Sequence, residues 1–122
     1  MVGKYDFTLI QGSDTEDIEF TLTEDDDTPI LLNGYTAKAQ LRKTVNSSEV
    51  LDELTTENSR IVIEDYVEDD VTYWRVILKF PGSVTRNYTI DKAVYDIDLC
   101  VNNKENRILE GCIVINPEVT RK

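Results

Sequence analysis

Apolar and polar residues alternate along most of this chain, which is the pattern of β-strands that bury one face. The stretch VTYWRVILKF, residues 71–80, shows the alternation most clearly. Its inward set would be Trp74, Val76, Leu78 and Phe80, and its outward set Tyr73, Arg75, Ile77 and Lys79. We therefore expect a half-buried strand whose outer face mixes aromatic, apolar and cationic side chains.

The same alternation predicts six further strands separated by turn signals. They are KYDFTLI, IEFTLT, TAKAQLR, RIVIEDY, AVYDIDLCV and RILEGCIVI. The acidic run EDDDTP favours a turn, and EDYVEDD, residues 64–70, indicates a hairpin tip. Two segments stay open. Residues 47–58 fit either a capped helical turn or an irregular edge strand, and residues 84–92 could hold one helical turn.

Together these elements give seven to nine short strands and at most one or two helical turns. We expect an all-β fold, an antiparallel β-sandwich of immunoglobulin-like or related type, with a closed barrel as the alternative. A chain of 122 residues fits a single domain over 1–122, which buries roughly two-thirds of its unfolded surface. The predicted core is Phe7, Leu9, Phe20, Leu22, Leu41, Trp74, Val76, Leu78, Tyr95, Ile97, Leu99, Ile113 and Ile115.

The two cysteines lie on the last predicted hairpin. Aligning the apolar faces of its strands pairs Leu99 with Leu109, Cys100 with Ile108 and Cys112 with Asp96, around a tip at 102–106. In that register Cys100 and Cys112 are about 13 Å apart, at ~3.3 Å per residue. A disulfide requires Cα atoms within roughly 7 Å, so two unpaired thiols on the outer face are predicted.

The charge balance narrows the range of partners. There are 24 acidic against 13 basic residues, a net charge of −11. Binding to a nucleic-acid backbone or to an anionic membrane surface needs clustered cations, so we expect neither partner. The N-terminal segment has no apolar core of signal-peptide length, which favours synthesis in a reducing cytosol.

Catalytic, cofactor and metal sites are not predicted. The sequence has no histidine, which excludes Ser-His-Asp and Cys-His arrangements and leaves two cysteines too few for a zinc shell. Asp96 and Asp98 form a same-face carboxylate pair, but a pair of this kind on an outer sheet face is usually just polar surface. The acidic runs lack the spacing of a calcium loop. Tyr66, Tyr73 or Tyr88 could stack on a sugar, which keeps a carbohydrate-binding module open.

Several motifs resemble a family of small tailed-bacteriophage proteins. They are TLIQGSD, TPILLNGYTAKAQLRK, VLDELTTEN, AVYDIDL and RILEGCIVINPEVTRK, which together span nearly the whole chain. By type the chain resembles the N-terminal β-sandwich domain of phage upper-baseplate proteins, which attaches a receptor-binding apparatus to the tail. The motifs consist of strand and turn residues rather than a catalytic signature.

The resemblance implies a structural or adaptor component of a virion, in the tail, baseplate or collar, and no enzyme. A capsid decoration protein is the alternative of the same kind. Its partners would be other virion proteins and copies of itself in a symmetric assembly, after synthesis in the host bacterial cytoplasm. The expected protein-interaction residues are Tyr73, Arg75, Ile77, Lys79, Arg121 and Lys122.

Overall fold

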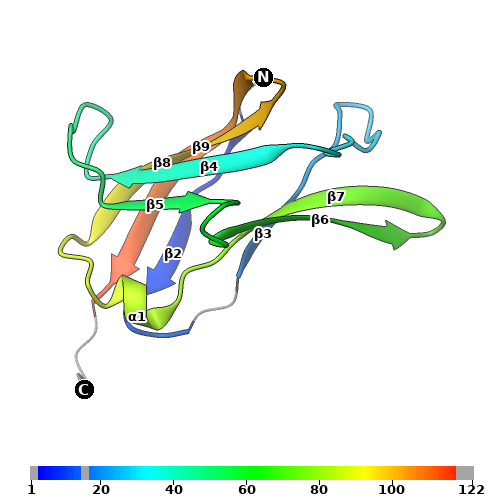
Figure 1. The fold of residues 1–122 in the computed structure, drawn as a ribbon. Coiled ribbons are helices and arrows are strands. Elements are labelled where there is room, and N and C mark those ends of the chain that lie inside the picture. The colour runs from blue at the N-terminus through cyan, green and yellow to red at the C-terminus, as the bar shows by residue number, and fades with distance from the viewer. Residues whose placement is uncertain (1–2, 15–16, 118–122) are drawn as a thin grey trace.

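The computed structural model describes residues 3–14 and 17–117, which form nine strands and one short helix (Figure 1). The elements are β1 (Gly3–Lys4), β2 (Phe7–Ile10), β3 (Ile18–Thr21), β4 (Thr36–Arg42), β5 (Asp52–Thr55), β6 (Ile61–Glu68), β7 (Val71–Leu78), α1 (Gly82–Thr85), β8 (Lys92–Val101) and β9 (Lys104–Asn116). The segment left open at 47–58 contains the edge strand β5, and the helical turn expected near 84–92 is α1, a few residues earlier.

The strands form two sheets. The larger sheet has the order β1-β9-β8-β4-β5, with β2 also paired to β9, and the smaller has the order β3-β7-β6. The prediction of an all-β sandwich is therefore confirmed, and the two sheets keep separate edges instead of closing into a barrel. The expected all-antiparallel pairing is wrong at one place, because β1 and β2 both run parallel to β9.

The core lies between the sheets. Ten of the thirteen predicted core residues are buried, and Phe20, Leu22 and Trp74 are half-buried against that core. Burial along β7 increases from exposed at Val71 to buried at Leu78, and Trp74 lies in the half-buried middle of the strand. The buried residues outside the prediction include Leu32, Leu54, Ile61, Tyr88 and Ala93.

The last hairpin has a different register from the one predicted. Its tip is the two-residue pair Asn102–Asn103, not 102–106, and a bulge follows Ile97. The observed pairs are Leu99 with Asn106, Cys100 with Glu105 and Cys112 with Val94. The conclusion about the thiols is nevertheless confirmed, because both cysteines are free and the register separates them further than expected.

A half-buried polar network ties the two sheets together. The Arg60 guanidinium donates two hydrogen bonds to the Asp52 carboxylate, at 2.8 and 3.3 Å, and a third to the backbone oxygen of Lys79, at 2.9 Å. The Tyr88 hydroxyl donates to the same carboxylate at 2.5 Å. Since Asp52 begins β5 and Lys79 follows β7, this network joins the end of the small sheet to the edge of the large one.

Candidate functional site: protein-interaction surfaces

The outer face of the small sheet carries three of the predicted interaction residues. Tyr73 lies opposite Tyr66 on β6, and the two rings stack with centroids 5.6 Å apart. The Arg75 guanidinium lies 4.9 Å from the centre of the Tyr66 ring. It also pairs with Glu64 at 2.6 Å, and this hydrogen-bonded partner raises the pKa of Arg75. These side chains form one connected polar and aromatic row.

Ile77, expected among the interaction residues of the outer face, is nearly buried. It points to the outer face as predicted, but only 6% of its surface is exposed, because β7 is the central strand and neighbours flank it on both sides. Lys79 follows the end of β7 and lies 3.8 Å from the Asp17 carboxylate. Arg121 and Lys122 lie outside the described residues.

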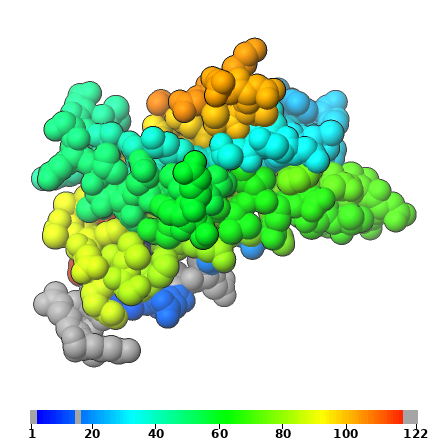
Figure 2. Space-filling model, in the orientation of Figure 1, coloured from blue at the N-terminus to red at the C-terminus, as the bar shows by residue number. Residues whose placement is uncertain are grey.

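The β6–β7 hairpin is the most prominent projection of the molecule (Figures 1 and 2). We call residues 64–71 the acidic arm. It contains five carboxylates and no cation, and its residues are Glu64, Asp65, Tyr66, Val67, Glu68, Asp69, Asp70 and Val71. Val67 is 68% exposed and Val71 38%. Because β6 is an edge strand, the arm also presents backbone groups that could pair with another chain.

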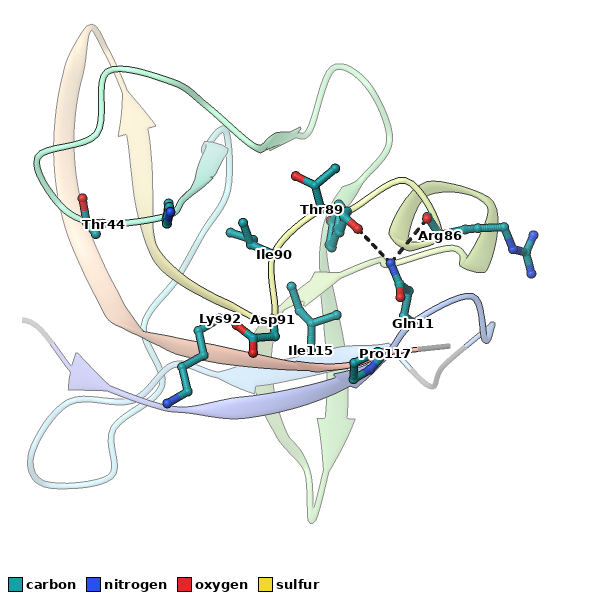
Figure 3. A pocket seen from close by; sticks show the side chains of 11 residues that line it. Gln11, Thr44, Arg86, Thr89, Ile90, Asp91, Lys92, Ile115 and Pro117 are labelled. Atoms are coloured by element: carbon teal, nitrogen blue, oxygen red, sulfur yellow. Dashed lines mark hydrogen bonds between the residues drawn. The ribbon is translucent and has the colours of Figure 1, made fainter. Parts of the chain in front are cut away.

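A hollow of about 720 Å³ lies at the opposite end of the molecule, beside α1 (Figure 3). We call it the end pocket. Its lining residues are Gln11, Lys43, Thr44, Arg86, Tyr88, Thr89, Ile90, Asp91, Lys92, Ile115 and Pro117. Ile90 and Ile115 lie near its centre, and the Lys92 side chain extends outwards from it. Lys43 and Lys92 are exposed, and no ion pair among the described residues involves either of them.

The wall of the end pocket is held by the Gln-Gly turn. The Gln11 side-chain amide donates to the backbone oxygens of Thr85, Arg86 and Tyr88, at 3.2, 3.3 and 2.8 Å. The Gly12 amide donates to the Thr85 hydroxyl at 3.0 Å, and Arg86 returns a hydrogen bond to the Gly12 oxygen at 3.1 Å. This interlock fixes the loop after α1, so the pocket is a preformed feature.

A second hollow, of about 760 Å³, lies on the outer face of the large sheet. Here Arg107 lies between the two predicted carboxylates, with 3.2 Å to Asp96 and 3.7 Å to Asp98. One Asp98 oxygen is buried without a hydrogen bond. Burial raises the pKa of Asp96, and the Arg107 charge opposes that rise. Asp96 and Asp98 are therefore both paired with Arg107, a cation of the same sheet.

Other chemistry considered from the sequence finds little geometric support. Tyr88 is buried with its hydroxyl on Asp52, so its ring offers no face to a sugar. Within 3–14 and 17–117, no three His, Cys, Asp or Glu side chains gather as a metal site requires. No helix of that part of the chain is long and apolar enough to cross a membrane.

Comparison with known proteins assigns no family. No protein-family model matches the chain. No curated protein matches it either. Among solved structures, the chain is similar to the extracellular fragment, including the stalk region, of novel immune-type receptor 11 from Ictalurus punctatus. That similarity has a TM-score of 0.37 and 10% identity over 100% of this chain and 90% of the receptor fragment. Overlap this weak carries no conclusion about function.

The sequence thus indicated some of these surfaces and missed the end pocket. It indicated the outer face of β7 and the acidic hairpin, although it gave the acidic residues no role beyond that of a hairpin tip. It gave no sign of the end pocket, whose lining comes from four separate segments of the chain. The sequence feature that could have pointed there is the Gln11-Gly12 turn. The Gln11 amide lies at the end of a predicted strand, where the strand pattern gives it no hydrogen-bond partner.

Proposed function

We propose that this chain is a structural or adaptor component of a bacteriophage particle, in the tail, baseplate or collar. It acts by binding neighbouring virion proteins and copies of itself, and it catalyses no reaction. The phage assignment is supported by the motif resemblance across nearly the whole chain. The binding role is supported by the shape and surface of the protein.

The observation that carries the binding role is the projecting acidic arm. An edge strand with an exposed valine is a surface that proteins either protect or use for pairing with another chain. In this arm, Val67 is 68% exposed, next to Glu68 and two residues from Asp65. The arm gives the protein a contact element that reaches away from its own core (Figure 2).

Two other functions make different predictions. A capsid decoration protein would use the same surfaces on the head instead of the tail. A carbohydrate-binding module would need open aromatic faces, but the Tyr66 ring already contacts Tyr73 and Arg75. The module hypothesis therefore has less support than the structural role.

Mass spectrometry of purified particles with copy-number determination tests the proposal. We expect the chain to be present in a low copy number that matches threefold, sixfold or twelvefold tail symmetry. Hundreds of copies would instead indicate the head. Absence from the particle would refute a virion role, and specific binding on a glycan array would favour the carbohydrate module.

A further inference from the structure

The two ends of the molecule have opposite chemistry. The acidic arm carries five carboxylates around Val67 and Val71. The end pocket combines an apolar floor, Ile90 and Ile115, with exposed lysines at its rim. An acidic segment with apolar side chains therefore fits a hollow with cations and an apolar floor, in a chain whose overall charge is −11.

The charge of the end pocket distinguishes it from the other hollow. Its lining includes three cations, Lys43, Arg86 and Lys92, against the single carboxylate Asp91. The hollow on the outer face of the large sheet has four cations against five carboxylates, and Arg107 there already binds two of them. Arg86 is also engaged, with the Gly12 oxygen, which leaves Lys43 and Lys92 as the charges that face an incoming chain.

The positions of the two surfaces decide the kind of assembly. The arm and the pocket lie at opposite ends of the fold (Figure 1), so the arm of one copy cannot reach its own pocket. A contact between two different surfaces is heterologous, and repeated head to tail it gives a ring or a filament. Pairing of two β6 edges is the symmetric rival, but it would bring two acidic arms together.

We infer that the acidic arm of one copy docks in the end pocket of the next. The tip residues Asp69 and Asp70 approach Lys43 and Lys92, and Val67 or Val71 covers the apolar floor. This inference rests on the proposed binding function, since it names a second copy of the chain as the partner. It does not depend on the phage assignment.

Disulfide trapping between two purified variants tests the contact directly. Both variants carry Cys100→Ser and Cys112→Ser, so that the native thiols cannot react. One adds Val67→Cys on the arm, and the other adds Thr44→Cys at the pocket, which leaves every arm and pocket charge in place. We expect the mixed dimer to form several-fold faster than either homodimer.

Leu31→Cys is the matched control for the arm thiol. Leu31 is apolar and 64% exposed, close to the 68% of Val67, but it lies outside the arm. A mixed Leu31–Thr44 dimer that forms as fast as the Val67–Thr44 dimer would overturn the inference, as would a dominant Val67–Val67 dimer. The latter would show arm-to-arm pairing instead.

The charges are tested in the same assay. Asp69→Asn with Asp70→Asn removes two carboxylates while keeping residues that accept the left-handed backbone of the tip. We expect this change, and separately Lys43→Glu with Lys92→Glu, to reduce trapping several-fold. Unchanged trapping in both would refute docking by charge. Circular dichroism and the unfolding midpoint check that each variant is folded.

Trapping and particle composition give separable outcomes. A chain found in purified particles but not trapped in solution would refute the arm-to-pocket contact and leave the virion role standing, with a different acidic chain as the candidate occupant of the pocket. Trapping in solution without any presence in particles would refute the virion role and support the arm-to-pocket contact.

Discussion

Gly111 shows how one residue connects the two ends of the chain. A Cβ atom at this position would lie 1.9 Å from the Tyr5 backbone oxygen and 2.7 Å from its carbon. The close approach lets the Asp6 carboxylate accept a hydrogen bond from the Cys112 amide at 2.8 Å. The Tyr95 hydroxyl donates to the same Tyr5 oxygen at 2.6 Å. The segment between β1 and β2 therefore packs directly against β9, because Gly111 has no side chain to keep it away.

Replacing Gly111 by alanine should destabilise the fold by about 1–3 kcal/mol, because the obstructing atom is backbone and cannot move aside freely. Urea denaturation measures the free energy of unfolding. Gly3→Ala is the control. Its Cβ would meet the Leu109 side chain at 3.2 Å and would leave the close approach of Tyr5 to Gly111 unchanged. Equal effects of the two substitutions would contradict the role given to Gly111.

Two buried tyrosines predict a loss of stability at high pH. Burial, with the Asp52 carboxylate next to the hydroxyl, raises the pKa of Tyr88, and burial raises the pKa of Tyr95. Since both folded pKa values exceed the ordinary 10.0, the unfolded chain loses these protons first as the pH rises. The stabilising contribution is complete below about pH 10 and declines above it.

The expected result is an unfolding free energy that falls from about pH 10 upwards. Tyr88→Phe with Tyr95→Phe should be less stable near neutral pH, because two hydrogen bonds are lost, but should show a shallower fall above pH 10. Urea denaturation at a series of pH values measures both. A double variant with the same alkaline slope as the wild type would show that other groups cause the loss.

At the scale of elements, both long hairpins turn in the same way. The tips Asp69–Asp70 and Asn102–Asn103 each have φ angles of 51° and 64°. Two consecutive residues with positive φ are the mark of the two-residue turn that matches the twist of antiparallel strands. Aspartate and asparagine tolerate this conformation better than other non-glycine residues, which explains their presence at both tips.

Asp70→Val should cost about 1–2 kcal/mol, because a β-branched residue is strained in the left-handed region. Asp65→Val is the matched control. It removes the same charge from the same hairpin, at an exposed strand position where valine is favoured. Thermal or urea denaturation should separate the two variants, and a control as unstable as Asp70→Val would show that charge, not backbone, sets the effect.

The alternation pattern predicted the strands well and their pairing less well. Side chains of β4 and β8 alternate cleanly, and their buried faces are the expected ones. Register depends on the length of the turn, and a run such as NNKEN does not reveal which two residues reverse the chain. The bulge after Ile97 adds a further shift that no apolar pattern encodes.

Partial burial was also beyond the reach of a local pattern. Trp74 and Ile77 lie on opposite faces of β7, as predicted, yet the outer residue is the more buried of the two. Their exposure depends on where each lies along a strand that is covered at one end and projects at the other. Only the arrangement of the whole sheet determines that difference.

At the scale of the molecule, the excess of carboxylates governs the response to salt. With 24 acidic against 13 basic residues, we expect like-charge repulsion to oppose the compact state more than the exposed ion pairs support it. Raising the ionic strength from about 0.01 M to about 0.15 M shortens the screening length from about 30 to about 8 Å. We expect the urea midpoint to rise over this range, and a fall would show that the ion pairs dominate.

The end pocket as a whole was not predicted, because its lining comes together only in the folded molecule. Gln11, Lys43, Tyr88 and Ile115 come from widely separated segments that meet at one end of the sandwich. The acidic arm, in contrast, is continuous in sequence and was visible as an acidic hairpin. Continuous surfaces are thus accessible to sequence reasoning, whereas composite ones need the topology.

The parallel pairing of β2 with β9 has a consequence for how the protein is made. Phe7 pairs with Ile113, and the Asp6–Cys112 hydrogen bond joins residues 106 positions apart. A ribosome adds roughly 5–20 residues per second, so the early strand is exposed for several seconds before its partner is synthesised. We expect this sheet to close only after residue 116 has left the ribosome, which makes the apolar face of β2 a natural binding site for chaperones on the nascent chain.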